Sequence, residues 1–268
     1  MPQTPMRIVT INGSLRKNGN KARALSVLEQ QLGADAEKWL GGCVEVKSVS
    51  LSDLRLEPCR GCRSCFDRGE DTCPCHDDLS IVAEAVREAD AVVLASPVYV
   101  DDVSGSMKTL IDRLAYMCHR PALSRVTAFA LATTGSSPCG HTLHTLSGAL
   151  LSWGACLVGG AGLKMGALQR AEDVAERHGD VPRRTSRTIM SALARRRSDR
   201  PSFVSLMMFA IQQSAWGRVS HDRLDYRYWK GEGFLERGRT FFHAHHANPV
   251  KVAAARVTGR TLAAIFRG

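Results

Sequence analysis

The 268-residue sequence contains no long apolar run, and this absence sets the first limits on what the protein can be. No window reaches the roughly 18 uninterrupted apolar residues of a membrane-spanning helix. The N-terminal stretch MPQTPMRIVTING leads straight into a strand pattern, without the basic start and apolar middle of a secretion signal. We therefore expect a cytoplasmic protein with no integral membrane segment, and a hydrophobic content of 44% is sufficient for a packed core.

Signatures of several function classes are missing as well. The sequence shows no Ser-His-Asp arrangement, no paired carboxylates and no nucleic-acid-binding motif. Its net charge of +10 lies in one part of the chain, because residues 1–175 have a balance of −1 and residues 176–268 a balance of +11. This asymmetry indicates a solvated basic face or the rim of an anionic ligand site, or else a surface for an acidic protein or anionic lipid. We expect no nucleic-acid partner.

What the sequence does contain, from Arg7 to Gly160, is a regular alternation of short β-branched runs with helical periods. Such an order predicts an α/β fold, in which right-handed crossovers build a parallel five-stranded sheet covered on both faces. In the first helical period, Leu25, Leu28 and Leu32 form one apolar stripe. The expected strands are 7–12, 44–50, 91–96, 126–134 and 155–160, and the expected helices are 20–32, 80–89, 107–116 and 143–153.

The remainder of the chain predicts a basic, mainly helical extension, so we expect domains at 1–175 and 176–268. Residues from Pro182 onward are interpreted as a linker, 202–216 as an apolar helix too short to span a bilayer, and 249–266 as a basic terminal helix. The run FFHAHHA places His243 and His246 one helical turn apart, which is a conceivable metal pair, but with no third ligand in view we expect no metal there.

The loop after the first expected strand, INGSLRKNGNKA, has the composition of an anion site. Gly13 permits a sharp turn, Ser14 offers a hydroxyl and Arg16 a guanidinium, and the helix that follows begins with unsatisfied amides. The loop lacks the Lys-Ser/Thr ending of a nucleoside triphosphate loop and the glycine spacing of a dinucleotide fingerprint. It therefore favours a phosphate monoester.

Two further strand-end loops point to the same edge of the sheet, where ligands of such folds bind. In ASPVYVDD, Pro97 forces the preceding residue into an extended conformation, and Val98 and Tyr99 present an apolar and an aromatic surface. In TTGSSPCGH, Gly135 and neighbouring hydroxyls supply polar groups. Together the three loops predict a site for a flat ring with a phosphate.

The motifs GSLRKNGN, SPVYV with SGSMKTLIDR, and TTGSS resemble those of the flavodoxin-like family of NAD(P)H-dependent FMN reductases over about residues 6–165. The resemblance implies a doubly wound, flavodoxin-like fold, an FMN cofactor and NAD(P)H as electron donor. It implies that Ser14, Arg16 and Asn20 surround the FMN phosphate, that Pro97, Val98, Tyr99, Thr134 and Gly135 border the isoalloxazine ring, and that Asn18, Lys21 and Ser136 complete the binding set. Lys108, Asp112 and Arg113 also match the family pattern, and we interpret them as helix and packing residues.

The most unusual segment is the cysteine-rich loop at residues 57–76, which holds five of the nine cysteines. Clustered thiols in a reducing cytosol favour metal binding or redox work over structural disulfides. The spacing C-x2-C-x2-C of Cys59, Cys62 and Cys65, followed by Cys73, suits a 4Fe-4S cluster better than zinc, with Cys75 as an alternative fourth ligand. This spacing resembles that of the iron–sulfur flavoproteins, and we expect the loop on the same edge of the sheet as the flavin.

These expectations lead to two functions and a weaker third. The first is an FMN-dependent NAD(P)H oxidoreductase that reduces a small acceptor such as a quinone, flavin, nitro or azo compound. The second is an iron–sulfur flavoprotein that carries electrons between FMN, a 4Fe-4S cluster and ferredoxin-like partners. The third is a thiol redox sensor that uses a metal-free loop. The family resemblance implies a homodimer or homotetramer with the flavin at a subunit interface.

Overall fold

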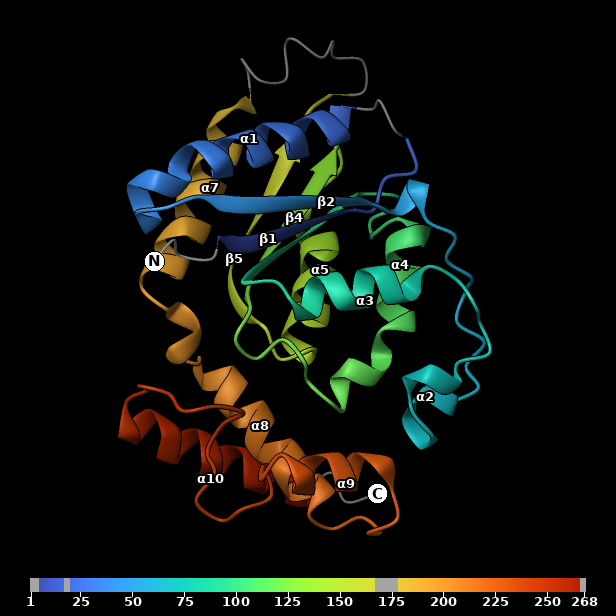
Figure 1. Ribbon diagram of the computed structural model, residues 1–268, viewed down its shortest axis with the longest axis vertical. Coiled ribbons are helices and arrows are strands. Elements are labelled where there is room, and N and C mark those ends of the chain that lie inside the picture. Colours follow the sequence, from blue (N-terminus) through green and yellow to red (C-terminus); the bar gives the residue numbers. More distant parts are fainter. Residues whose placement is uncertain (1–4, 17–19, 167–177, 266–268) are drawn as a thin grey trace.

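The computed structural model describes residues 5–16, 20–166 and 178–265, and its centre is a sheet of parallel strands (Figure 1). The strand order is β2-β1-β3-β4-β5, in which β1 and β3 are neighbours although β2 lies between them in the sequence. This is the order of a flavodoxin-like doubly wound fold, which confirms the expected fold class. The strands are β1 (Met6–Asn12), β2 (Val44–Ser50), β3 (Ala91–Pro97), β4 (Thr127–Thr134) and β5 (Cys156–Lys164).

Helices cover both faces of the sheet, because its central strands are apolar on both sides. All residues of β3 and β4 are buried. One face packs against α1 (Asn20–Leu40) and α7 (Asp180–Ala194), and Leu25, Leu28 and Leu32 of α1 are buried there, as expected for the apolar stripe. The other face packs against α3 (Leu79–Arg87), α4 (Gly105–Arg113) and α5 (Gly140–Ser152).

One stretch that we expected to be a linker is a helix. Pro182 lies in the first turn of α7, where a proline is tolerated because the amide it lacks would have no intrahelical partner. Ile189 and Met190 of the same helix are buried against the sheet. The expected domain boundary at residue 175 lies outside the described residues and stays a prediction.

Beyond α7 the chain forms a separate helical unit, which we call the α8–α10 unit. It consists of α8 (Phe203–Trp216), α9 (Leu224–Gly231) and α10 (Pro249–Ile265), at the foot of the sheet in Figure 1. Its core is largely aromatic, with Phe209 and Trp229 fully buried 5.4 Å apart between ring centroids. Within the described residues, no helix combines the length and apolarity needed to cross a bilayer.

The expected helical histidine pair is wrong, because residues 241–248 form bends and irregular backbone. His243 is buried, and its ring nitrogens lie 2.9 Å from the carbonyl oxygens of Ala244 and Ser124. These contacts give His243 a packing role between the α8–α10 unit and the sheet domain. The remaining short elements are α2 (Ser64–Asp67) and the 3-10 turns η1 (Leu51–Asp53), η2 (Glu70–Thr72), η3 (Ala115–Cys118) and η4 (Arg197–Asp199).

Candidate functional site

The loops after β1, β3 and β4 meet at the carboxyl edge of the sheet. The amide of Gly13 donates to the carbonyl of Ala95 at 2.8 Å, and the amide of Val98 donates to the carbonyl of Thr133 at 2.9 Å. Each loop is therefore fastened to the neighbouring strand. This is the switch point between β1 and β3, at which ligands bind in doubly wound folds. We call this region the strand edge.

The first loop packs tightly at its turn, where Gly13 leaves little room for a side chain. A Cβ atom on Gly13 would lie 3.0 Å from Cβ of Met107 and 3.1 Å from Oγ of Ser104. The hydroxyl groups of Ser104 and Ser106 also donate to the Gly13 carbonyl, at 2.5 Å and 2.9 Å. The N-terminal end of α4 therefore holds the loop in place.

The expected phosphate residues lie in or next to this loop. Ser14 is fully buried and its Oγ accepts a hydrogen bond from the amide of Arg16 at 3.2 Å, whereas Arg16 is exposed. Asn18 lies outside the described residues, and only the backbone of Asn20 and Lys21, at the start of α1, is described.

The second loop carries a strained turn that projects from the strand edge. The amide of Tyr99 donates to the carbonyl of Asp102 at 2.8 Å and the reverse bond measures 3.1 Å, so the two residues between them form a tight reversal. Val100 and Asp101 have φ values of 48° and 68°. Left-handed backbone at a β-branched residue is a rare conformation that often marks functional sites. Val100 is fully exposed, and the Tyr99 side chain is 41% exposed.

The third loop follows Thr134, which is buried at the end of β4, whereas Gly135 and Ser136 are exposed. The amide of Gly166 donates to the Gly135 carbonyl at 3.1 Å, which fixes the loop to the end of β5. A hydroxyl and a guanidinium on the first loop, an aromatic ring on the second and an exposed glycine and serine on the third form a donor set that fits a planar ligand with a phosphate.

The cysteine loop, residues 57–76, leaves and rejoins the sheet domain at one point. The amide of Arg55 donates to Oδ2 of Asp78 at 2.7 Å, and the amide of Asp78 donates back to the carbonyl of Arg55 at 3.1 Å. We call this pair the neck of the loop. The chain thus enters and leaves the loop at adjacent positions.

A buried ion pair closes the loop just beyond its neck. The guanidinium of Arg113 donates to both carboxylate oxygens of Asp77, at 2.5 Å and 3.1 Å, and to the carbonyl of Glu57 at 2.7 Å, while the two side chains are 2% and 0% exposed. Burial alone would raise the pKa of Asp77, but hydrogen bonds from Arg113 and from the amides of Glu57 and Leu79 outweigh it and hold this pKa below its usual value. Arg113 therefore joins the beginning of the loop to its end.

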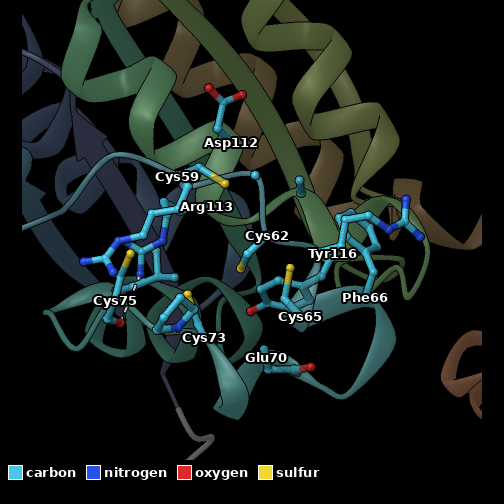
Figure 2. A pocket seen from close by; sticks show the side chains of 16 residues that line it. Cys59, Cys62, Cys65, Phe66, Glu70, Cys73, Cys75, Asp112, Arg113 and Tyr116 are labelled. Atoms are coloured by element: carbon cyan, nitrogen blue, oxygen red, sulfur yellow. Dashed lines mark hydrogen bonds between the residues drawn. The ribbon is translucent and has the colours of Figure 1, made fainter.

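The five cysteines of the loop line one cavity of about 100 Å³ (Figure 2). Figure 2 shows Cys62 and Cys65 in the middle of the view, Cys59 above them, Cys73 below and Cys75 to the left. The loop also contributes Phe66 and Glu70 to the wall, and the end of α4 and the following turn contribute Asp112, Arg113 and Tyr116.

The expected position of this loop beside the flavin is wrong for a single chain. Its cavity lies at the C-terminal end of α4, whereas Ser104 and Ser106 place the N-terminal end of α4 at the strand edge. The nine residues of α4 separate the two regions by roughly 13 Å at 1.5 Å per residue. The reason is the Arg113–Asp77 pair, which fastens the loop to the far end of this helix.

The thiols differ in acidity according to their burial. Hydrogen bonding to Ser64 lowers the pKa of the exposed Cys62 thiol. Burial raises the pKa of Cys65, and the neighbouring thiols of Cys73 and Cys59 raise it further. Burial also raises the pKa of Cys75, against the opposing effect of Arg113. The thiols therefore influence one another electrostatically across the cavity.

The thiols around the cavity are ligands of the type that a 4Fe-4S cluster takes. Within the described part of the chain, no three His, Cys, Asp or Glu side chains converge closely enough to hold one ion. A 4Fe-4S cluster takes one thiolate at each of four irons, so its ligands surround a volume and do not meet at a point. Arg113 also lines the cavity, and its guanidinium brings a positive charge that suits a group held by thiolates.

The sequence patterns missed Asp77 and underestimated Arg113. The two residues are 36 positions apart in the chain, and neither local spacing nor periodicity indicates that they pair. The match of Arg113 to the family pattern was the available signal for its importance. Arg113 does more than pack, because it also joins the two ends of the cysteine loop.

Comparison with known proteins places this geometry in context. A family model described as NADPH-dependent FMN reductase matches residues 6–167, which is more than half of the chain. An iron–sulfur flavoprotein of Archaeoglobus fulgidus is 28% identical over 234 residues, covering 86% of this chain and 100% of that protein. An iron–sulfur flavoprotein of Methanocaldococcus jannaschii is 37% identical over 108 residues, covering 40% of this chain and 51% of that protein, so this match spans about half of its length.

Solved structures share the fold at low sequence identity. RosB with bound 8-demethyl-8-formylriboflavin-5′-phosphate is 20% identical with a TM-score of 0.58, covering 80% of this chain and 88% of that chain. The apo form of an NADH:FMN oxidoreductase is 20% identical with a TM-score of 0.50, covering 70% of this chain and 88% of that chain. These likenesses show a common flavodoxin-like fold.

Proposed function

The chain belongs to the NADPH-dependent FMN reductase family and is a flavin oxidoreductase, and from this premise we propose that it acts as an iron–sulfur flavoprotein. FMN would bind at the strand edge and a 4Fe-4S cluster in the cysteine cavity. The observation that carries the proposal is the cavity that all five thiols of the loop line. The names of the relatives from A. fulgidus and M. jannaschii support the same assignment.

Each region of the chain would have a defined task. Ser14, Arg16 and the first amides of α1 would hold the FMN phosphate, and Tyr99 would border the ring together with Pro97, Val98, Thr134, Gly135 and Ser136. When bound, FMN supplies hydride chemistry and the cluster supplies one-electron transfer. The protein would therefore connect a two-electron donor with a one-electron acceptor such as a ferredoxin-like protein.

Cys59, Cys62, Cys65 and Cys73 would be the cluster ligands. Figure 2 shows Cys75 to the left, beside Arg113, and Cys62 and Cys65 farther from Arg113 in the middle of the view. The amide and guanidinium groups of the loop would keep the thiols oriented, and the Arg113 side chain would offset part of the negative charge that the ligands bring.

A second candidate function is direct reduction of a small acceptor by NAD(P)H. The family description and the exposed Tyr99 ring at the strand edge favour it. In this version the cysteine loop has no electron-transfer role, and a quinone, flavin, nitro or azo compound would stack near Tyr99.

The separation along α4 bears on the expected homodimer or homotetramer. In a single chain, roughly 13 Å of helix lies between the strand edge and the cavity. An oligomer would offer an additional arrangement, in which the loop of one copy approaches the strand edge of another. Light scattering of the purified protein measures the number of copies.

Anaerobic purification followed by absorption spectroscopy and assays of iron, sulfide and flavin tests the proposal. We expect about one FMN and about four irons per chain, with broad absorption near 400 nm beneath the flavin bands. Flavin without iron, with rapid bleaching by NADH or NADPH, would reject the iron–sulfur version and support the second candidate. Protein without any flavin after incubation with FMN would reject both.

A further inference from the structure

The α8–α10 unit contacts the cysteine loop, although about 150 residues separate them in the sequence. Helix α2, which contains Cys65, packs against α9, and the two lie side by side at the lower right of Figure 1. Gly69, which lies two residues after α2, is also close to α9, since an added Cβ there would lie 4.0 Å from Cδ2 of Leu224. The C-terminal part of the chain thus forms one wall against which the loop rests.

A buried network of charges connects the two parts. Arg120 donates to the carbonyl of Cys65 at 2.5 Å and to Oε2 of Glu70 at 3.3 Å, and it forms an ion pair with Oδ1 of Asp225. Arg120 and Asp225 are 8% and 6% exposed. The Glu70 side chain is 36% exposed, whereas the Asp225 side chain is 8% exposed, so Asp225 is the more buried carboxylate that orients Arg120.

An aromatic column accompanies this network. The rings of Phe66 and His119 lie 4.5 Å apart between centroids, and those of His119 and Trp216 lie 4.8 Å apart. Nδ1 of His119 lies 2.8 Å from Oδ2 of Asp225, and Nε1 of Trp229 donates to the His119 carbonyl at 2.8 Å. Phe66 follows Cys65 directly, so the column fixes the same part of the loop from a second side.

We propose that the α8–α10 unit is a clamp for the cysteine loop and that Asp225 is its positioning residue, acting through Arg120 on the backbone at Cys65. The purpose of the clamp, which is to keep the thiols in a geometry that accepts a cluster, rests on the proposed function. The clamp itself is a property of the metal-free chain. Its test can therefore fail or succeed separately from cluster binding.

The first test uses the substitution Asp225→Asn in the metal-free, full-length protein. Loss of the Asp225 charge removes the ion pair that ties Arg120 to the α8–α10 unit and leaves only the pair with Glu70 of the loop itself, so the loop should open more often. We expect the rate of Cys65 alkylation by iodoacetamide, measured by mass spectrometry, to rise about tenfold or more, since breaking a buried ion pair favours local opening. Cys156 on β5 serves as the internal reference, and its rate should stay unchanged.

Two variants control this experiment. Asp222→Asn removes an exposed carboxylate three residues earlier, which accepts a hydrogen bond from the Ser220 hydroxyl, and should leave the Cys65 rate at the wild-type value. Asp225→Glu keeps the charge and should restore most of the protection. An unchanged Cys65 rate in Asp225→Asn, or an equal increase in Asp222→Asn, would overturn the clamp.

A measurement on the wild-type chain covers the case in which Asp225→Asn does not fold. In native-state hydrogen exchange at increasing denaturant, the amides of α2 should lose protection together with those of α9 and before those of β3 and β4. Protection of α2 that persists after α9 has opened would overturn the proposal.

The cluster-loaded protein links the clamp to the proposed function. In Asp225→Asn the electron paramagnetic resonance spectrum of the reduced cluster should broaden, and the half-life of the cluster in air should shorten about tenfold, with rescue by Asp225→Glu. A wild-type protein that never takes up iron would reject the proposed function, while the alkylation result would still decide the clamp.

Discussion

The strand edge and the cysteine loop are held in place by different means. At the strand edge, hydrogen bonds to uncharged backbone groups determine the positions of the loops, both from other backbone groups, as between Gly13 and Ala95, and from the hydroxyls of Ser104 and Ser106. In the cysteine loop, side chains far away in the sequence do so, chiefly Arg113 with Asp77 and Arg120 with Asp225. A site built on backbone contacts tolerates most side-chain substitutions, whereas one built on buried charges depends on a few residues.

The largest expected effect comes from Arg113→Ala. Removal of the guanidinium leaves Asp77 as a buried, unpaired carboxylate, so the free energy of unfolding should fall by about 3–5 kcal/mol. Urea denaturation measures this change, and iron uptake should be lost while FMN binding at the strand edge is retained. Lys108→Ala is the matched control on the same helix, since its ion pair with Asp112 is exposed and should contribute less than about 1 kcal/mol. Equal effects of the two variants would contradict the contrast between the regions.

A smaller effect is expected at the strand edge from Gly13→Ala. The added Cβ would lie 3.0 Å from Cβ of Met107, so the start of α4 must shift, at a cost of about 1–3 kcal/mol. Isothermal titration should show weaker FMN binding, because the phosphate loop moves with it. Gly148→Ala in α5 meets no atom within 4 Å and should stabilise the protein by about 0.4–1 kcal/mol. A Gly13→Ala protein with unchanged FMN affinity would show that the loop is less constrained than its packing indicates.

A gain in stability is expected from Val100→Asn in the turn after β3. Asn adopts left-handed backbone more readily than a β-branched residue, so relief of the strain should add about 1 kcal/mol to the free energy of unfolding. Thermal denaturation measures this gain. Asp101→Asn, next to it, replaces one tolerant residue with another and should leave the melting temperature unchanged. A lower melting temperature for Val100→Asn would mean that the Val100 side chain has stabilising contacts.

The smallest effect concerns the acidity of Cys62. Its pKa lies below the usual thiol value because of hydrogen bonding to Ser64, so Ser64→Ala should raise this pKa. Since the thiolate is the reacting form, the curve of Cys62 alkylation rate against pH in the metal-free chain should shift to higher pH. The Cys65 curve should lie at higher pH than the Cys62 curve in the wild-type protein, because burial raises its pKa. Coincident curves for the two thiols would refute this assignment.

The sequence predicted the sheet well because its signals are local. Apolar runs at β3 and β4 and the stripe Leu25, Leu28 and Leu32 express burial directly in residue spacing. It failed at α7, where the pattern from Pro182 onward predicts a linker although a first-turn proline is compatible with a helix. It failed at His243 and His246, because a helical spacing does not reveal an irregular backbone held by contacts with Ser124.

The parts of the site that depend on local sequence signals were predictable, and the parts that depend on distant pairs of residues were not. Strand-end loops follow from strand order, so the meeting of the Gly13, Tyr99 and Gly135 segments could be expected. The position of the cysteine loop at the C-terminal end of α4 could not be predicted, because it depends on the pairing of Arg113 with Asp77, which are 36 residues apart in the sequence. The pairing of Asp225 with Arg120 was even less predictable, because the two residues are 105 positions apart in the sequence.

The neck between Arg55 and Asp78 has a consequence for how such proteins can change. Since the chain departs and returns through adjacent backbone positions, the whole thiol-bearing segment can be shortened, exchanged or deleted without altering the length of any strand. A designer could therefore graft the segment onto a related protein by carrying over the arginine that seals it.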